Sequence, residues 1–154
     1  MDKKELLNVY YGNLKMPEGF EINPEPLILS TTSQKILNKN FSFSKEWDKI
    51  DTYIREYSLV KHDLPIEGIE TWGDMYLPNQ CSKPLKNNGD FTLIYGVKIK
   101  NTCNIVINYE HDKTWEIPLV TNKYIMFPSS KKYYVEHNKS TEINYIQTIL
   151  YELK

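Results

Sequence analysis

Apolar and polar side chains alternate with a period of two residues over most of the chain after Ile69. In the clearest stretch, Thr92, Gly96 and Lys98 separate a series of apolar residues, which are Phe91, Leu93, Tyr95, Val97 and Ile99. Similar stretches cover residues 103–109, 115–119, 124–127, 133–135 and 143–151. Because successive side chains of a strand point to opposite faces, the pattern predicts roughly seven short β-strands.

Clusters of turn-forming residues separate these predicted strands. Asn, Asp, Gly and Ser suit the backbone conformations that tight turns require. The clusters are Asn87-Asn88-Gly89, Asn101-Thr102, His111-Asp112-Lys113, Thr121-Asn122, Ser129–Lys132 and His137–Ser140. Short strands with turns at near-regular spacing predict a sandwich or barrel, and we expect a mostly-β jelly roll.

One segment has helical spacing instead, from Lys45 to about Tyr57. Ser44 is a suitable N-cap, and two acidic residues follow in the first turn, where the helix dipole favours negative charge. The apolar stripe consists of Trp47, Ile50, Ile54 and Tyr57. This spacing predicts a single helix that packs on the sheet and buttresses the jelly roll.

The first forty residues show neither period clearly. Glycines and prolines interrupt them, at Gly12, Pro17, Gly19, Pro24 and Pro26. We therefore predict an irregular N-terminal arm over residues 1–40, with a short strand at Leu27–Leu29, and a jelly-roll domain over residues 41–154. Such an arm suits wrapping around a neighbouring subunit, and packing on its own domain is equally compatible.

Composition narrows the class of protein. The 154 residues are 40% hydrophobic and 25% charged, which is typical of one soluble globular domain. The net charge of −1 supplies no basic field for a nucleic-acid backbone, so we expect no nucleic-acid partner. No apolar run approaches the ~18 residues of a membrane span, and Met1–Glu5 does not begin a signal peptide. We therefore expect neither membrane insertion nor secretion through such a peptide.

The residues most often used in metal and nucleophile sites are few. Cys81 and Cys103 are too few for a disulfide framework, and we expect buried free thiols, with a bridge or a reactive pair as the alternatives. The three histidines, His62, His111 and His137, lie in predicted loops, and none has a second histidine or an acid two residues away. Glu67, Glu70 and Asp74 form an acidic cluster, for which we expect a solvated loop.

Three stretches of the chain resemble one known family. Trp72-Gly73-Asp74-Met75-Tyr76, followed by Gln80, is similar to a tryptophan-led strand ahead of that family's iron motif. Gly89–Ile99 is similar to the strand after the motif, and Phe127-Pro128-Ser129, with Val135-Glu136 beyond it, is similar to a later strand end. The family is the iron(II)/2-oxoglutarate oxygenase superfamily, in its phage-encoded members, and the resemblance covers about Ile69 to Tyr151. It implies a double-stranded β-helix.

The resemblance also implies a metal site whose ligands this chain lacks. The family uses a histidine and a carboxylate two residues apart and a distal histidine, which leave open positions on iron. The aligned positions here are Leu85, Asn87 and Tyr133, and His137 lies four residues too late. A late-strand Arg or Lys grips 2-oxoglutarate in the family, but residues 142–151 contain neither, and the only arginine, Arg55, lies on the predicted helix.

We therefore expect a non-catalytic jelly-roll protein without a cofactor, which binds another protein or its own copies as a phage or viral assembly component. Its expected location is the cytoplasm of the host cell or the virion. The alternative is a divergent dioxygenase that uses Fe(II) and 2-oxoglutarate, with metal ligands drawn from Asn87, Tyr133 or a displaced His137. A third possibility is a small-ligand binder whose barrel mouth is lined by Tyr95, Tyr133 and Gln147.

Overall fold

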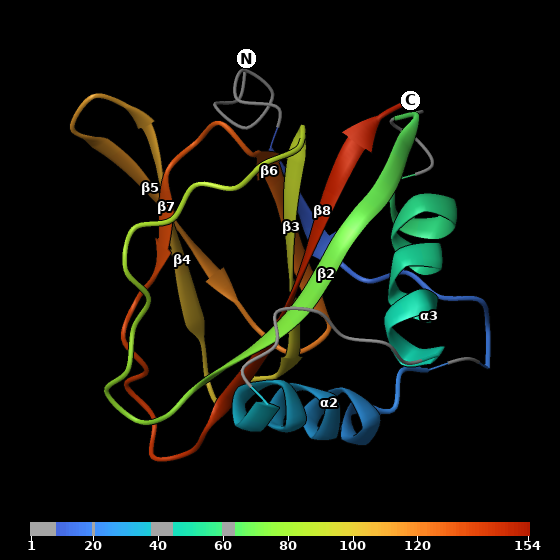
Figure 1. The fold of residues 1–154 in the computed structure, drawn as a ribbon, viewed down its shortest axis with the longest axis horizontal. Coiled ribbons are helices and arrows are strands. Elements are labelled where there is room, and N and C mark those ends of the chain that lie inside the picture. Colours follow the sequence, from blue (N-terminus) through green and yellow to red (C-terminus); the bar gives the residue numbers. More distant parts are fainter. Residues whose placement is uncertain (1–8, 20, 38–44, 60–63) are drawn as a thin grey trace.

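The computed structural model describes residues 9–19, 21–37, 45–59 and 64–154 (Figure 1). Its N-terminal third holds strand β1 (Tyr10–Asn13), helix α2 (Pro24–Leu37) and helix α3 (Lys45–Tyr53), which continues into a π-helical turn (Ile54–Ser58). Seven strands follow: β2 (Ile66–Tyr76), β3 (Phe91–Lys98), β4 (Cys103–Glu110), β5 (Lys113–Leu119), β6 (Lys123–Pro128), β7 (Tyr133–Val135) and β8 (Asn144–Leu153). None of the helices in the described ranges has the length and apolar character that crossing a membrane requires.

The strands form two antiparallel sheets that face each other. The larger sheet has the order β1-β6-β3-β8-β2, and the smaller has the order β5-β4-β7. From β3 to β8 the chain passes back and forth between the sheets, as in a jelly roll. Figure 1 shows the helices on one side of the larger sheet and the smaller sheet on the other. The predicted mostly-β jelly roll is therefore confirmed.

Two hydrophobic cores lie on the two faces of the larger sheet. The helix-side core joins Leu27 of α2 and Ile50 of α3 to alternate residues of the sheet, such as Leu93 and Ile149. The inner core lies between the sheets, and it contains the intervening residue Ile94 together with side chains of the smaller sheet, such as Ile105, Ile107 and Val135. Strand β3 supplies side chains to both cores and is buried from Phe91 to Val97.

The predicted turns form where the sequence places them. Asn101, His111 and Asn122 each have a positive φ between consecutive strands, and Gly89 has a φ of +86° just before β3. Asparagine and glycine accept this left-handed conformation more readily than other residues. The strand predictions after Ile69 are confirmed by β2 to β8.

The predicted irregularity of residues 1–40 is wrong for the described part of that range. Strand β1 pairs with β6, and residues 24–37 form α2. The short strand predicted at Leu27–Leu29 is therefore wrong, because these residues are helical. The side-chain Oδ1 of Asn23 accepts a hydrogen bond from the backbone N–H of Glu25 at 3.2 Å and caps the helix. Pro24 and Pro26 lie in the first turn, where the missing N–H groups would have had no partner within the helix. Leu27 is fully buried in the helix-side core.

The helix predicted over residues 45–57 is confirmed, with a change near its end. The Leu59 N–H donates to the Ile54 carbonyl at 2.8 Å, which is the wider spacing of a π-helical turn. The buried aromatic position therefore belongs to Tyr53, whereas Tyr57, which the stripe predicted to be buried, is 40% exposed. The predicted N-cap, Ser44, lies outside the described residues. In the part of the chain that the structure describes, two helices, α2 and α3, cover the larger sheet, where the sequence predicted one.

Candidate functional site

The structure brings together the three positions that align with the metal ligands of the resembled family. Leu85 forms an isolated antiparallel bridge with Tyr133. The Leu85 N–H donates to the Tyr133 carbonyl at 2.6 Å, and the Tyr133 N–H donates to the Leu85 carbonyl at 2.9 Å. Opposed residues of such a bridge share a face, and Asn87, two residues further along, reaches the same side.

Neutral side chains that are hydrogen-bonded to one another occupy the positions that align with the metal ligands. Asn87 Nδ2 donates to Tyr133 Oη at 3.1 Å and lies 3.4 Å from Thr92 Oγ1. Thr92 Oγ1 in turn lies 2.8 Å from Ser129 Oγ, in a fully buried hydrogen bond. The ring of Tyr133 packs edge-on against Phe127, with the ring centroids 5.0 Å apart. Asn87, Thr92, Ser129 and Tyr133 are called the Tyr133 cluster below, and they connect β3 and β7 to the segment before β3 and to the residue that follows β6.

Burial raises the pKa values of the phenols near this cluster. It raises the pKa of Tyr133 to about 12, against a smaller lowering by the hydrogen bond from Asn87. Burial likewise raises the pKa of Tyr76, with the nearby charge of Asp74 adding to the effect. Asp74 Oδ2 accepts a hydrogen bond from Trp72 Nε1 at 3.0 Å. Asp74 is therefore the carboxylate whose charge reaches both phenols.

The predicted solvated loop at Glu67, Glu70 and Asp74 is wrong, because all three residues lie in β2. Asp74 pairs with Ile146, whose side chain belongs to the inner core, so Asp74 lies on the same face as the Tyr133 cluster and is only partly exposed. The sequence contained a signal for this placement of Asp74: Asp74 lies two residues after Trp72, and residues two apart on a strand share a face.

Iron does not fit the aligned positions. Leu85 has no donor atom, and Asn87 and Tyr133 are hydrogen-bonded to each other as neutral groups. Iron(II) oxygenases instead use two histidines and a carboxylate. Within the described ranges, no group of three His, Cys, Asp or Glu side chains lies close enough together to hold a metal ion. His111 and His137 are exposed, and His62 lies outside the described residues.

Tyr95, Tyr133 and Gln147, which were predicted to line a pocket at the mouth of the barrel, do not form one site. Tyr95 and Gln147 are cross-strand neighbours on the helix side of the larger sheet, where Gln147 Nε2 donates to Thr71 Oγ1 at 2.8 Å and Tyr95 Oη donates to Asn122. Tyr133 belongs to the inner core, on the opposite face. The odd-numbered residues of β8 face the helices, so the sheet itself separates Gln147 from Tyr133.

The two cysteines have different surroundings. Cys103 is buried in the inner core, where burial raises the pKa of its thiol to about 12. Cys81 is exposed, so the prediction of a buried thiol is confirmed for Cys103 and wrong for Cys81. Both are free thiols in the structure.

Comparisons with known proteins place the fold. No family model matches the sequence, and no curated protein matches it. Among solved structures, a prolyl-4-hydroxylase of Pseudomonas putida matches over 97% of this chain and 91% of its own, with 7% identity and a TM-score of 0.65.

A prolyl hydroxylase of Trichoplax adhaerens, in complex with a peptide fragment of the hypoxia inducible factor, covers 97% of this chain and 86% of its own, with 9% identity and a TM-score of 0.66. An oxidoreductase of the 2OG-Fe(II) oxygenase family from Burkholderia pseudomallei covers 70% of this chain, at 6% identity and a TM-score of 0.58. This chain spans only 58% of the Burkholderia protein. The likeness shows that the chain has the double-stranded β-helix fold of these oxygenases, as the sequence resemblance implies.

Proposed function

We propose that this protein is a non-catalytic double-stranded β-helix protein that acts by binding another protein. The observation that carries the proposal is the hydrogen bond between Asn87 and Tyr133. It joins two of the positions where the resembled family holds its metal, and it does so with neutral groups, the buried Tyr133 and the partly buried Asn87. A site built in this way contributes to the stability of the fold rather than to metal binding.

A role in assembly is the finer part of the proposal. Jelly rolls are recurrent units of viral capsids, although the fold alone does not fix a function. Support comes from the large side chains that the described surface exposes, among them Tyr11, Tyr57 and Tyr134, each about two fifths exposed. Tyrosine is enriched in protein interfaces because its ring supplies contact area and its hydroxyl a hydrogen bond. The partner is another protein or further copies of this chain, in the host cytoplasm or the virion.

A matched pair of proteins tests the non-catalytic part. Thermal unfolding of the full chain is measured without oxygen, with manganese as a substitute for iron, and with or without 2-oxoglutarate. The second protein carries Leu85→His, Asn87→Asp and Tyr133→His, which restores the ligand types of the family. A ligand at a hundred times its dissociation constant stabilises a protein by about 2.7 kcal/mol, and this raises the midpoint by several degrees.

We expect no shift for the natural sequence and a metal-dependent shift for the triple variant. A metal-dependent shift of the natural sequence that grows with 2-oxoglutarate would overturn the proposal. Sedimentation velocity at rising protein concentration tests self-association, for which a mass above that of the 18.2 kDa chain is expected.

The second candidate function is a divergent iron(II)/2-oxoglutarate oxygenase. The observation that favours it is the extent of the structural likeness, since two prolyl hydroxylases match 97% of the chain. It requires metal ligands other than Leu85, Asn87 and Tyr133, because these do not supply the necessary donors. The same manganese titration separates the two candidates.

A further inference from the structure

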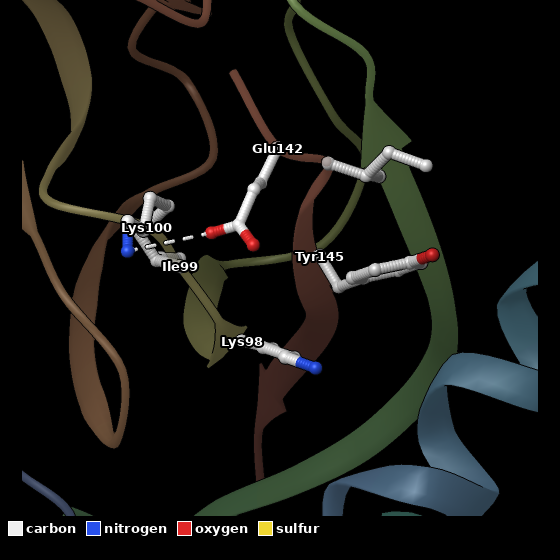
Figure 2. A pocket seen from close by; sticks show the side chains of 6 residues that line it. Lys98, Ile99, Lys100, Glu142 and Tyr145 are labelled. Atoms are coloured by element: carbon white, nitrogen blue, oxygen red, sulfur yellow. Dashed lines mark ion pairs between the residues drawn. The ribbon is translucent and has the colours of Figure 1, made fainter. Parts of the chain in front are cut away.

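A pocket of about 360 Å³ lies at the far end of β3 from the Tyr133 cluster (Figure 2). Its lining residues are Lys98, Ile99, Lys100, Glu142, Ile143 and Tyr145. The pocket forms where the pairing between β3 and β8 shifts by one residue, between Gly96 and Lys98. Six residues of extended strand separate Lys98 from Thr92, a distance of ~20 Å, so the pocket is separate from the candidate site.

The charges around the pocket are unequal. Lys100 Nζ lies 3.6 Å from Glu142 Oε2, and both side chains are more than half exposed. Ion pairs of this kind contribute little to stability and open readily. Lys98 has no carboxylate partner among the described residues, so the lining carries one ammonium group in excess.

The side-chain directions make this excess charge available to a ligand. Lys98 and Tyr145 are directly opposed in the β3–β8 register and therefore share a face. Figure 2 shows these two side chains projecting side by side, while Lys100 turns towards Glu142. The ammonium group and the phenol hydroxyl are both hydrogen-bond donors, and Ile99 and Ile143 are the apolar residues of the lining.

We propose that this pocket binds a small oxyanion, a carboxylate or a phosphate, that carries a short apolar group. Lys98 supplies the positive charge, and Tyr145 Oη donates a hydrogen bond to an anion oxygen. A lysine ammonium binds anions as a point charge without demanding one planar geometry, so carboxylate and phosphate share the chemistry that is recognised here. The volume is at the small end of the range for ligand pockets, which suits a metabolite rather than a macromolecule.

The Lys100–Glu142 ion pair provides a second way to change anion binding at this pocket. Glu142 is the only carboxylate in the lining, and it competes with an incoming anion for Lys100. Removing the charge of Glu142 therefore leaves two ammonium groups for the ligand. Removing the charge of Lys98 leaves a lining in which the remaining cation is already paired.

The test is a titration of the full chain, followed by ¹H–¹⁵N NMR, with phenyl phosphate in one arm and benzoate in the other. The natural sequence is compared with Lys98→Gln, Glu142→Gln and the control Lys83→Gln, which removes the same charge from an exposed position outside the lining. We expect saturable shifts at the lining residues, an affinity roughly tenfold lower for Lys98→Gln, and a severalfold higher affinity for Glu142→Gln.

The two arms distinguish the sources of the anion: binding of one probe alone identifies the ligand as a phosphate or as a carboxylate. Absence of saturable shifts with both probes overturns the proposal. Equal losses of affinity in Lys98→Gln and Lys83→Gln also overturn it, because a general charge effect then explains the binding. No metal enters the titration, so neither result bears on the proposed function of the jelly roll.

Discussion

The central strands of the larger sheet, β6, β3 and β8, are buried on both faces, whereas the smaller sheet is buried on one. In β3 of the larger sheet, every residue from Phe91 to Val97 is buried. In β7 of the smaller sheet, Tyr133 and Val135 are buried, and Tyr134 between them is 38% exposed. The difference arises because α2 and α3 cover the outer face of the larger sheet, and the described residues place no helix over the smaller one.

This difference shows where polar side chains need internal partners. On the larger sheet, Thr92 and Gln147 are fully buried, and each has a side-chain hydrogen bond, to Ser129 and Thr71 respectively. A buried polar atom without a partner destabilises the fold by about 1–3 kcal/mol, so the hydrogen bonds that Thr92 and the Gln147 amide nitrogen make stabilise the larger sheet. On the open face of the smaller sheet, polar side chains such as Glu116 remain exposed to solvent.

The largest expected effect on stability comes from removing a buried aromatic ring, in comparison with removing an exposed one. Phe127→Ala removes a fully buried ring that packs on Tyr133, and we expect a loss of about 3–5 kcal/mol in the free energy of unfolding. The matched control, Tyr134→Ala, removes a ring from the open face and is expected to change stability by less than about 1 kcal/mol. Urea unfolding measures both values. Equal losses would contradict the assignment of the open face.

The next effect is alkaline destabilisation through Tyr133. Its pKa is about 12 in the folded protein and 10.0 for the ordinary side chain, so folding favours the protonated phenol. The resulting stabilisation, of about 3 kcal/mol, is fully present below pH 10 and is lost as the pH rises to 12. Urea unfolding between pH 9 and 12 measures the slope. We expect a shallower slope for Tyr133→Phe, with Tyr134→Phe as the matched control; an unchanged slope for Tyr133→Phe would contradict the burial of this hydroxyl.

Gly73→Ala tests how closely α2 covers the larger sheet. A Cβ at Gly73 would overlap Thr31 Oγ1 and lie 3.0 Å from Thr31 Cβ. We expect a loss of about 1–3 kcal/mol on urea unfolding, and a smaller loss when Thr31→Ala is also present. The control is Gly12→Ala on β1, where a Cβ would meet no atom closer than 3.8 Å. The same loss at Gly12 and Gly73 would show that close packing by α2 is not the cause.

The smallest effect concerns two carboxylates on the open face of the smaller sheet. Asn104 Nδ2 donates to Glu116 at 2.7 Å and to Glu136 at 3.0 Å. The hydrogen bond with Glu136 raises the pKa of Glu116, so at neutral pH the ionised Glu116 is repelled by its neighbour. We expect Glu116→Gln to stabilise the protein by no more than about 0.5 kcal/mol at pH 7.

This gain is expected to disappear as the pH falls through the raised pKa, because Glu116 then becomes neutral without substitution. Urea unfolding at pH 7 and pH 4 measures the difference. The control, Glu110→Gln, removes a carboxylate that lies 3.4 Å from Lys113 and is expected to bring no gain. A loss of stability for Glu116→Gln at pH 7 would show that the two carboxylates do not repel each other.

The sequence predicted the strands well because each has a clear period of two and a turn signal at its ends. It missed α2 because Pro24 and Pro26 were interpreted as breakers, although Asn23 before Pro24 is a helix-start signal. The aligned positions Leu85, Asn87 and Tyr133 were identified, but the contact between the Asn87 and Tyr133 side chains was not. Their residues lie 46 positions apart, and local pattern does not specify contacts at that range.

The sequence by itself determined the mostly-β class, the strand and turn positions, and the residue types at the positions that align with the metal ligands of the resembled family. Only the tertiary structure decided which faces of the strands are covered, because burial depends on what packs there and not on the strand's own pattern. It also decided that Tyr95 and Gln147 are separated from Tyr133 by the larger sheet, and that Lys98 lies beside Tyr145 at a pocket. Such neighbourhoods depend on strand pairing between distant segments, which the alternation of apolar and polar residues leaves open.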